Sequence, residues 1–438
     1  MLVQSYRLIV QKYLTGSTSV NIAASVEGAV ANGRIAAGAL LPPVRALATQ
    51  LEVSPATVAA AYRLLQDRGV VVSDGRRGTR VRPAPPIAFP AEAALPEGVK
   101  DLATGNPDPE LLPRLPRLEL DQRLYGEETN DPELLELARA QFAEDGVPAE
   151  NLAVVSGALD GIERVLREHL RAGDRVAVED PSFTGVLDLL NALSLVAVPV
   201  PVDDQGLDPS ELRRAIRSCD AVIVTPRAQN PTGAALTARR ARELRGVLAA
   251  RPGLVVIEDD HAGPAAGAEY LSIVDRQREK WAVVRSVSKW LGPDLRVALL
   301  ATDRQTHARV QGRQMLGARW VSHILQRVVS SIWRDRVTLR AGRVYTERRE
   351  ALLAALAERG IPARGVSGLN VWIPVAEESA TVQALLLLGW AVKAGERYRI
   401  ASPPAIRVTI ATLEPREAER FAEDLVRVLA SRRRASGV

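Results

Sequence analysis

The chain has 438 residues, more than one ordinary hydrophobic core organises, so we expect two or more domains. Its single cysteine, Cys219, excludes a disulfide framework, and four histidines without a close pair argue against a metal site, so no metal is expected. No segment approaches the roughly 20 apolar residues of a membrane span, and the N-terminus does not resemble a signal peptide. A cytoplasmic protein without a membrane partner is therefore expected.

Charge is unevenly distributed along the chain. The net charge is +5, yet residues 1–83 alone carry ten Lys and Arg side chains against four Asp and Glu. A basic segment joined to a nearly neutral remainder favours a module that binds phosphate backbones. A solvated basic surface is the alternative, which charge alone does not exclude.

Three helices are predicted near the N-terminus. Residues 21–33 show helical spacing of apolar side chains, and a short helix is expected at 44–51. Ser54 can cap a further helix that has Pro55 at its first position and ends at Gly69. The side chains predicted to face the core from this last helix are Val58, Ala61, Tyr62 and Leu65.

A two-stranded wing is predicted next. The sequence VVVSDGRRGTRV at 70–81 alternates around a DGRRG turn. Two helices joined by a short turn and followed by a basic wing predict a winged helix-turn-helix, which we assign to residues 1–82. The predicted DNA-binding residues are Ser54, Ala56 and Thr57 at the start of the second helix, Arg45 on the first, and Arg76, Arg77 and Thr79 on the wing. A small helical domain for protein contacts is the alternative.

This segment resembles the DNA-binding domain of the GntR superfamily of bacterial regulators over residues 20–82. The matching motifs are GALLPPVRALATQLEVSPATV and GRRGTRV. Two departures concern base recognition: Pro55 stands where the family commonly has arginine, and Ala59 replaces a second arginine. The resemblance therefore implies promoter DNA as a partner but does not specify the operator sequence.

An α/β domain is predicted after a linker. Residues 83–98 are rich in Pro and Ala without periodicity, so we expect a semi-rigid linker at 83–99. Over 100–438, short apolar runs alternate with amphipathic helical stretches, which predicts an α/β fold with a largely parallel sheet and a small C-terminal α+β part. In such sheets, ligands bind beyond the carboxyl ends of the strands.

Chemically distinctive residues follow five of the predicted strands. They are Ser156, Gly157 and Ala158 after LAVV, Phe183 after RVAVEDP, Asn230 after AVIVTP, Asp259 after LVVIE, and Ser286, Ser288, Lys289 and Arg296 after AVVR. A helix start, hydroxyls and an arginine suit a phosphate, a lysine suits an aldehyde, and a buried carboxylate suits a protonated pyridine nitrogen. Pyridoxal phosphate carries all of these groups. Taken singly, each residue could instead be a surface lysine, a turn or a helix cap.

Residues 100–435 resemble fold-type-I aminotransferases, with the motifs SGA, EDPSF, NPTG, EDD and SVSK in order. Joined to the GntR-type head, the chain resembles MocR/GabR-type transcription regulators. The resemblance implies that Lys289 forms the internal aldimine, Asp259 pairs with the pyridinium, Phe183 stacks on the ring and Asn230 contacts its hydroxyl. It places Ser156, Gly157, Ala158, Ser286, Ser288 and Arg296 around the phosphate.

The same resemblance implies two further roles. Tyr125 matches a tyrosine that reaches the phosphate from a partner subunit, which implies a homodimer. Arg407 matches an arginine that binds an amino-acid carboxylate, and a solvated strand-end charge is its alternative. Two departures argue against efficient transamination. His261, expected to titrate near neutrality, replaces a tyrosine that bonds the ring hydroxyl, and Leu159-Asp160 replaces glutamines at the start of the phosphate helix.

The leading hypothesis is a DNA-binding transcription regulator that binds pyridoxal phosphate through Lys289 and senses the cofactor or an amine or amino-acid effector. The second is an active aminotransferase with an accessory DNA-binding head, so enzymatic activity stays open. The third is a regulator whose large domain has lost the cofactor. The joint presence of Lys289, Asp259 and Asn230 disfavours the third, and the complete winged helix-turn-helix pattern disfavours the second.

Overall fold

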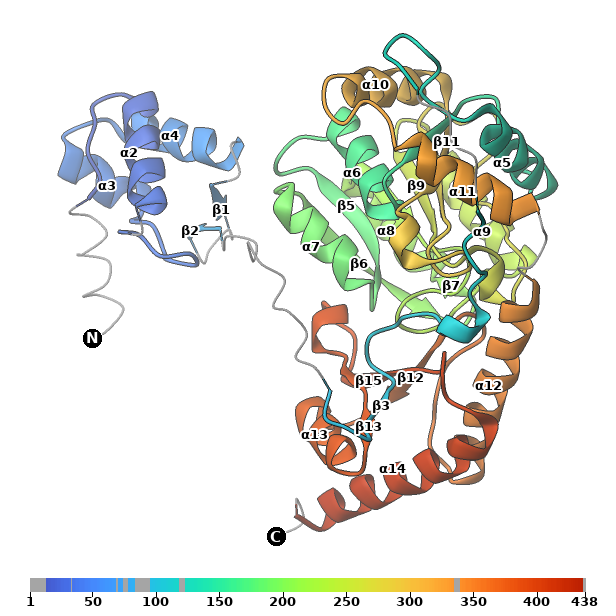
Figure 1. Cartoon of the computed structure of the whole chain (residues 1–438). Helices are drawn as coiled ribbons and strands as arrows, with labels where there is room; N and C mark the ends of the chain where they lie inside the picture. The colour runs from blue at the N-terminus through green and yellow to red at the C-terminus, as the bar shows by residue number, and fades with distance from the viewer. Residues whose placement is uncertain are drawn as a thin grey trace. The chain divides into compact units, whose positions relative to one another are not determined.

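The computed structural model describes residues 13–32, 34–67, 70–73, 78–82, 95–117, 123–334 and 339–435. Two compact units divide the chain, the first formed mainly within residues 1–92 and the second mainly within 93–438 (Figure 1). None of the helices in the described ranges combines the length and apolar character that crossing a lipid bilayer requires.

The N-terminal unit has the predicted winged helix-turn-helix. Helix α2 covers Ser19–Ala31, α3 covers Val44–Leu51 and α4 covers Pro55–Asp67, while β1 (Val71–Ser73) pairs antiparallel with β2 (Thr79–Val81). Helix α4 starts at the predicted position because Ser54 Oγ accepts a hydrogen bond from the Thr57 N–H at 3.1 Å. Gly33, Gly69, Arg76 and Arg77 lie outside the described residues.

The core of this unit forms between α2, α3, α4 and the wing strands. Val58, Ala61, Tyr62 and Leu65 are all buried, as predicted, and α2 packs against α4. The Tyr62 hydroxyl donates a hydrogen bond to the Pro42 carbonyl at 2.7 Å, which ties α4 to the segment before α3. The start of α4 is left exposed at Pro55 and Ala56.

The second unit is built on an eight-stranded sheet of order β4-β11-β10-β9-β8-β5-β6-β7. The strands cover Leu152–Val155 (β4), Arg175–Asp180 (β5), Val196–Asp203 (β6), Gly206–Leu207 (β7), Ala221–Val224 (β8), Val255–Asp260 (β9), Trp281–Ser286 (β10) and Ala298–Thr302 (β11). Strands β5, β8, β9 and β10 pair in parallel, whereas β11 is antiparallel to β10 and β4, and β7 to β6. The predicted parallel sheet is thus found at the centre, with antiparallel pairs toward both edges.

Helices follow the strands and cover the sheet (Figure 1). They are α5 (Pro132–Glu144), α6 (Ala158–His169), α7 (Thr184–Ala192), α8 (Pro209–Ala215), α9 (Ala238–Ala249), α10 (Arg304–Met315), α11 (His323–Arg334) and α12 (Leu339–Glu358). Short 3-10 turns lie at Pro109–Leu111, Ile216–Ser218, Gly263–Ala266, Pro293–Leu295 and Glu396–Tyr398. Helix α6 packs against β9 and β10 and follows β4, whose last residue is level with the last residue of β10, so its N-terminus lies at the carboxyl ends of these strands.

The C-terminal part forms the expected small α+β layer. Its three-stranded sheet joins β12 (Asn370–Pro374), β15 (Ala405–Thr409) and β14 (Lys393–Ala394), and β13 (Trp390–Ala391) pairs with β3 (Lys100–Asp101). Helix α13 covers Glu378–Leu387, and α14 (Pro415–Ala435) packs against α12. Strand β15 carries Arg407.

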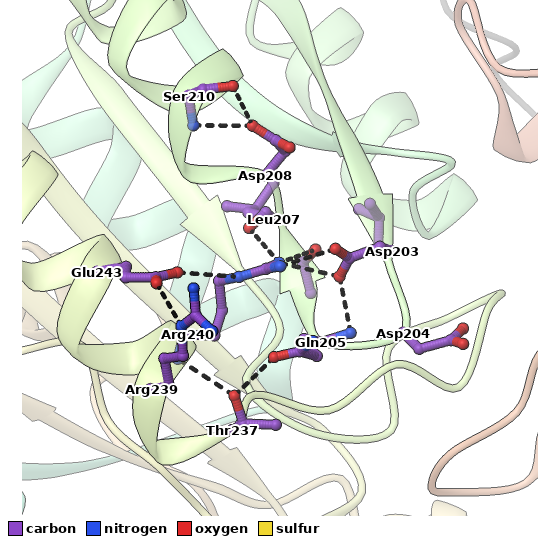
Figure 2. Close-up of polar contacts among 12 residues, drawn as sticks. Asp203, Asp204, Gln205, Leu207, Asp208, Ser210, Thr237, Arg239, Arg240 and Glu243 are labelled. Carbon is purple, nitrogen blue, oxygen red and sulfur yellow. Dashed lines mark hydrogen bonds and ion pairs between the residues drawn. The ribbon is translucent and has the colours of Figure 1, made fainter.

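A buried arginine holds the β6–β7 hairpin against α9 (Figure 2). Arg240 donates hydrogen bonds to both carboxylate oxygens of Asp203, at 2.9 and 2.7 Å, and to the carbonyls of Gly206 and Leu207. The two terminal nitrogens of the guanidinium are thereby engaged by acceptors within the unit, and its Nε lies 3.7 Å from Glu243 Oε2. We therefore assign this cluster a role in stabilising the fold rather than in ligand binding.

Candidate cofactor site

Lys289 follows β10 and is partly buried. Its ammonium group donates a hydrogen bond to the Gly105 carbonyl at 2.6 Å. Burial, and then the positive charge of Arg407, lower the pKa of Lys289 to about 8. An amine with such a pKa is partly uncharged near neutrality, and the uncharged form is the one that attacks a carbonyl.

Asp259 lies near the end of β9 and is 4% exposed. Its Oδ1 atom has no hydrogen-bond partner among the described residues. Burial, and then the charges of Asp260 and Glu179, raise the pKa of Asp259 to about 8. A buried carboxyl oxygen without a partner is costly, so this position fits a ligand that brings its own N–H donor.

Asp260 is the next residue on β9 and anchors the strand. Its carboxylate accepts two hydrogen bonds from Arg227, each at 2.9 Å, and one from Arg285 Nε at 2.6 Å. Burial opposes ionisation, but these two guanidinium groups hold the pKa of Asp260 well below its ordinary value. Because successive side chains of a strand point to opposite faces, this network fixes the position of Asp259 without contacting its face.

His261 follows Asp259 by two residues and is partly buried. Burial, and then the positive charge of Lys289, lower the pKa of His261 to about 4. The prediction that His261 titrates near neutrality is therefore wrong. The imidazole is neutral over the physiological range and offers one N–H donor and one acceptor nitrogen.

Serine hydroxyls, a helix start and an arginine meet at the other end of the site. Pairing of β10 with β11 and of β11 with β4 places Ser286 level with Val155, the residue before Ser156. The Ser286 and Ser288 hydroxyls lie 3.0 Å apart, and Arg296 Nη2 donates to the Ser156 carbonyl at 3.1 Å. Gly157 has a φ of +102°, and a Cβ there would lie 2.5 Å from Arg296 Nη2. Together with the first residue of α6, Ala158, this arrangement suits a phosphate.

Arg407 brings the C-terminal part to the site. It is 4% exposed, and Nη1 donates to Asn230 Oδ1 at 3.2 Å, while Nη2 donates to the Ala103 carbonyl. Its guanidinium carbon also lies 5.0 Å from the centre of the Tyr398 ring. The alternative of a solvated strand-end charge is therefore wrong. Lys289 and Arg407 both lie against the loop that includes Gly105, and Asn230 joins them through its bond to Arg407.

The two predicted aromatic residues have different surroundings. Phe183 immediately precedes α7, is partly buried, and flanks Gly185 together with Leu159. Tyr125 is 79% exposed, and its ring contacts Trp320 at 5.7 Å between centroids. Phe183 is thus held within the unit, whereas Tyr125 is available to a second molecule.

The structure adds a residue that the sequence analysis missed. The buried Gln229 amide donates to Glu179 Oε2 at 3.1 Å and to the Pro181 carbonyl at 2.8 Å, and its oxygen accepts from the Thr232 N–H at 3.0 Å. It thereby fixes the turn that carries Asn230 against the end of β5. The only sequence signal for this role is its position between a strand end and the NPTG motif.

The predicted DNA-binding residues in the described ranges lie on the surface of the N-terminal unit. Arg45 on α3 and Ser54 and Ala56 at the start of α4 are exposed, and Thr57 and Thr79 are partly exposed. The Ser54 and Thr57 hydroxyls lie 2.8 Å apart, so each is partly engaged at the helix cap. This surface is compatible with a helix start that approaches base edges.

Comparisons with known proteins give the same two parts. Residues 100–425 match the aminotransferase class I and II family, and residues 18–81 match the gntR family of bacterial regulatory proteins. The vitamin B6 salvage pathway transcriptional repressor PtsJ of Salmonella typhimurium is 40% identical, with 95% of this chain and 99% of that protein covered. The HTH-type pyridoxine biosynthesis transcriptional regulator PdxR of Corynebacterium glutamicum is 31% identical over 53% of each chain.

Solved structures support the fold of the second unit. An archaeal alanine:glyoxylate aminotransferase has a TM-score of 0.68 at 20% identity, covering 76% of this chain and 91% of that one. Pyridoxal phosphate is the cofactor that the aminotransferase fold implies, and the residues present fit it. Asp259 has an oxygen without a partner within the described ranges, Lys289 has a lowered pKa, and Gly157 leaves room beside Arg296. The chain belongs to the class I and II aminotransferase family and, with its GntR-type head, to the MocR type of transcription regulators.

Proposed function

We propose that this regulator binds pyridoxal phosphate at the site around Lys289 and that the bound cofactor sets its affinity for a promoter operator. The observation that carries the proposal is the buried Asp259 Oδ1, which has no hydrogen-bond partner in the part of the chain that the structure describes and fits the ring nitrogen of the cofactor. Two relatives support a link to cofactor supply, because one represses vitamin B6 salvage and the other regulates pyridoxine biosynthesis. Genes of vitamin B6 supply are therefore the proposed targets.

Each end of the cofactor has a proposed set of partners. When bound, pyridoxal phosphate supplies an aldehyde and an electron-withdrawing ring. Lys289 would hold the aldehyde carbon, Asp259 would accept the ring N–H, Asn230 and His261 would contact the ring hydroxyl, and Phe183 would cover the ring. The phosphate would be held by Ser156, Gly157, Ala158, Ser286, Ser288 and Arg296.

The DNA-binding function is proposed for residues 1–82, with a linker at 83–99 and the effector domain at 100–438. The start of α4, with Ala56 and Thr57, would face base edges in the major groove. Arg45, Arg76, Arg77 and Thr79 would contact phosphates, which makes binding weaken steeply as salt rises. Salt-independent binding would argue against this interface.

A homodimer is proposed through the surface around Tyr125. Leu124 and Tyr125 are 67% and 79% exposed, and Trp320 and Arg319 flank the Tyr125 ring. An exposed apolar and aromatic surface of this kind is common at protein interfaces. Tyr125 would reach the phosphate of the second subunit. Sedimentation that shows a monomer with tightly bound cofactor would contradict this arrangement.

An amino-acid effector is the second candidate ligand, and Arg407 favours it. A ligand carboxylate could take the place of Asn230 Oδ1 as the partner of Arg407 Nη1 and draw the C-terminal part toward the cofactor. Residual transamination is compatible with the same residues, since Lys289, Asp259 and Arg407 are all present. Steady-state turnover with a panel of amino acids distinguishes a sensor from an enzyme.

The proposed function is tested by measuring operator affinity in three states. A promoter fragment from the protein's own locus is titrated with cofactor-free protein, with protein plus pyridoxal phosphate, and with protein plus cofactor and amino acids. We expect affinities that differ severalfold, since coupling between sites is typically ~1–3 kcal/mol. Identical affinity in all three states would overturn the sensor function and leave the aminotransferase-like part as a scaffold.

A further inference from the structure

Ser156, one of the residues expected around the phosphate, has a backbone N–H that is already paired. The Ser156 N–H donates a hydrogen bond to Asp160 Oδ2 at 2.9 Å. Asp160 lies in the first turn of α6, the helix whose N-terminus forms the phosphate end of the site. Its carboxylate is in turn held by Arg164, whose Nε lies 3.0 Å from both Asp160 oxygens.

A phosphate and this carboxylate compete for the same place. Both are anions, and both are stabilised by the N–H groups and the dipole at a helix start. A phosphate that uses the Ser156 N–H must displace Asp160 Oδ2 and then lie beside a like charge. Arg164 keeps the carboxylate close to the helix start, so the competing anion stays near the site.

Resting on the proposed function, we propose that Asp160 sets the affinity for the cofactor by competing with its phosphate for the Ser156 N–H. Binding at the phosphate end is then weaker than the other groups there would allow. With a lower affinity the site is only partly occupied, so the bound fraction changes with the free concentration of the phosphorylated cofactor. A sensor of that concentration requires such a response. An enzyme that needs its cofactor bound throughout would gain nothing from a carboxylate that competes with the phosphate.

The competing explanation is a purely structural helix cap. An acidic side chain at the third position of a helix commonly reaches back to the N–H groups before the first turn. On that explanation, neutralising Asp160 weakens α6 and leaves the cofactor's affinity unchanged or lower. The two explanations therefore predict opposite signs for the same substitution.

The test compares Asp160→Asn with Glu163→Gln on the same helix. Glu163 also pairs with an arginine four residues on, at 2.8 Å from Arg167 Nε, but lies away from Ser156, so it is a matched control. Dissociation constants are measured by absorbance for pyridoxal phosphate and for pyridoxal, which lacks the phosphate. Thermal unfolding confirms that each variant is folded, and Asp160→Ser replaces the Asn variant if that variant does not fold.

We expect Asp160→Asn to bind pyridoxal phosphate about tenfold more tightly, ~1.4 kcal/mol, with pyridoxal affinity and the Glu163→Gln variant unchanged. An unchanged or weaker affinity for pyridoxal phosphate in the folded variant would overturn the inference. Equal tightening for pyridoxal would do the same, because the effect would then not act through the phosphate. Asp160→Asn could tighten cofactor binding while the affinity for the operator is the same with and without cofactor. That result would support the competition by Asp160 and contradict the proposed control of operator affinity.

Discussion

The two ends of the cofactor site are built differently. At the ring end, Asp259 is buried and has an oxygen without a partner among the described residues, and a network of buried ion pairs fixes its strand. At the phosphate end, Ser156 and Arg296 are exposed, and the Ser156 N–H is already hydrogen bonded to Asp160. Among the described residues, the ring end therefore leaves one buried acceptor for a ligand to pair with, whereas at the phosphate end one backbone donor is already paired.

This difference indicates how recognition is divided between the two ends. A rigid buried carboxyl group selects for a ligand with an N–H donor. Because the carboxyl group is buried away from water, a hydrogen bond from the ligand offsets the free-energy cost of its desolvation. An exposed anion-binding position with its own carboxylate contributes selectivity for phosphate but less affinity. In an enzyme, both ends of the site are expected to bind the cofactor tightly. In a concentration sensor, one end is expected to bind it weakly, so that the cofactor dissociates when its concentration falls.

Removing Lys289 tests the ring end with the largest expected effect. Lys289→Ala cannot form a covalent link with the aldehyde, so the lysine-linked absorbance in the presence of pyridoxal phosphate should be lost completely. Borohydride should then fail to attach the cofactor to the protein. Lys280→Ala is the control, because Lys280 directly precedes β10. This variant should keep the absorbance and the borohydride adduct. A Lys289→Ala protein with an unchanged spectrum and adduct would exclude this lysine.

Neutralising Asp259 should weaken the ring end for either form of the ligand. Asp259→Asn keeps the shape of the side chain but loses the charge that pairs with a protonated ring nitrogen. A hydrogen bond to a charged group contributes about 1.5–3 kcal/mol, so dissociation constants should rise ~10- to 100-fold. Pyridoxal phosphate and pyridoxal should be affected alike, measured by absorbance titration. A loss confined to pyridoxal phosphate would contradict the assignment of Asp259 to the ring.

The pH dependence of stability examines the same carboxyl group without any ligand. The pKa of Asp259 is raised from 3.8 to about 8, so the folded protein retains a proton that the unfolded chain has lost. Its contribution to stability is full below the unfolded pKa and is lost as pH rises through about 8. Between pH 5 and 7.5, wild type should therefore lose up to about 1.4 kcal/mol per pH unit relative to Asp259→Asn.

Chemical denaturation of both cofactor-free proteins at several pH values measures this difference. The subtraction removes the contributions of His261 and Lys289, whose pKa values are lowered to about 4 and about 8. Parallel stability curves for the two proteins would show that Asp259 ionises normally. The ring end would then offer no unsatisfied group for a ligand.

A single hydroxyl at the phosphate end should matter less. Ser288→Ala removes one donor whose neighbour, Ser286, remains 3.0 Å away in wild type. A net contribution of ~1 kcal/mol predicts about a fivefold weaker binding of pyridoxal phosphate. Pyridoxal, titrated in parallel, should bind the variant and wild type equally. Equal weakening of both ligands would place Ser288 at the ring rather than at the phosphate.

The sequence predicted the backbone framework of the site well. Ser156, Asp259 and Lys289 each follow or end a strand, because short apolar runs separated by turn residues define where parallel strands stop. The cap at Ser54 was predicted for a similar reason, since capping depends on residues that are neighbours in sequence.

Features that depend on distant neighbours were not predicted. The lowered pKa of His261 arises from burial and from Lys289, which lies 28 residues along the chain, beyond the end of another strand, β10. Arg407 is buried against Ala103 and Asn230, which no local pattern indicates. The antiparallel position of β11 was missed because its apolar run has the same composition as a parallel strand.

The central claim is that occupancy of the cofactor site sets operator affinity. The most direct test is one titration with two readouts: pyridoxal phosphate is added to cofactor-free protein on its labelled operator, and lysine-linked absorbance and fluorescence anisotropy are recorded together. We predict that both signals change with the same midpoint, and that Lys289→Ala shows neither change. Saturation of the absorbance with constant operator occupancy would contradict the account.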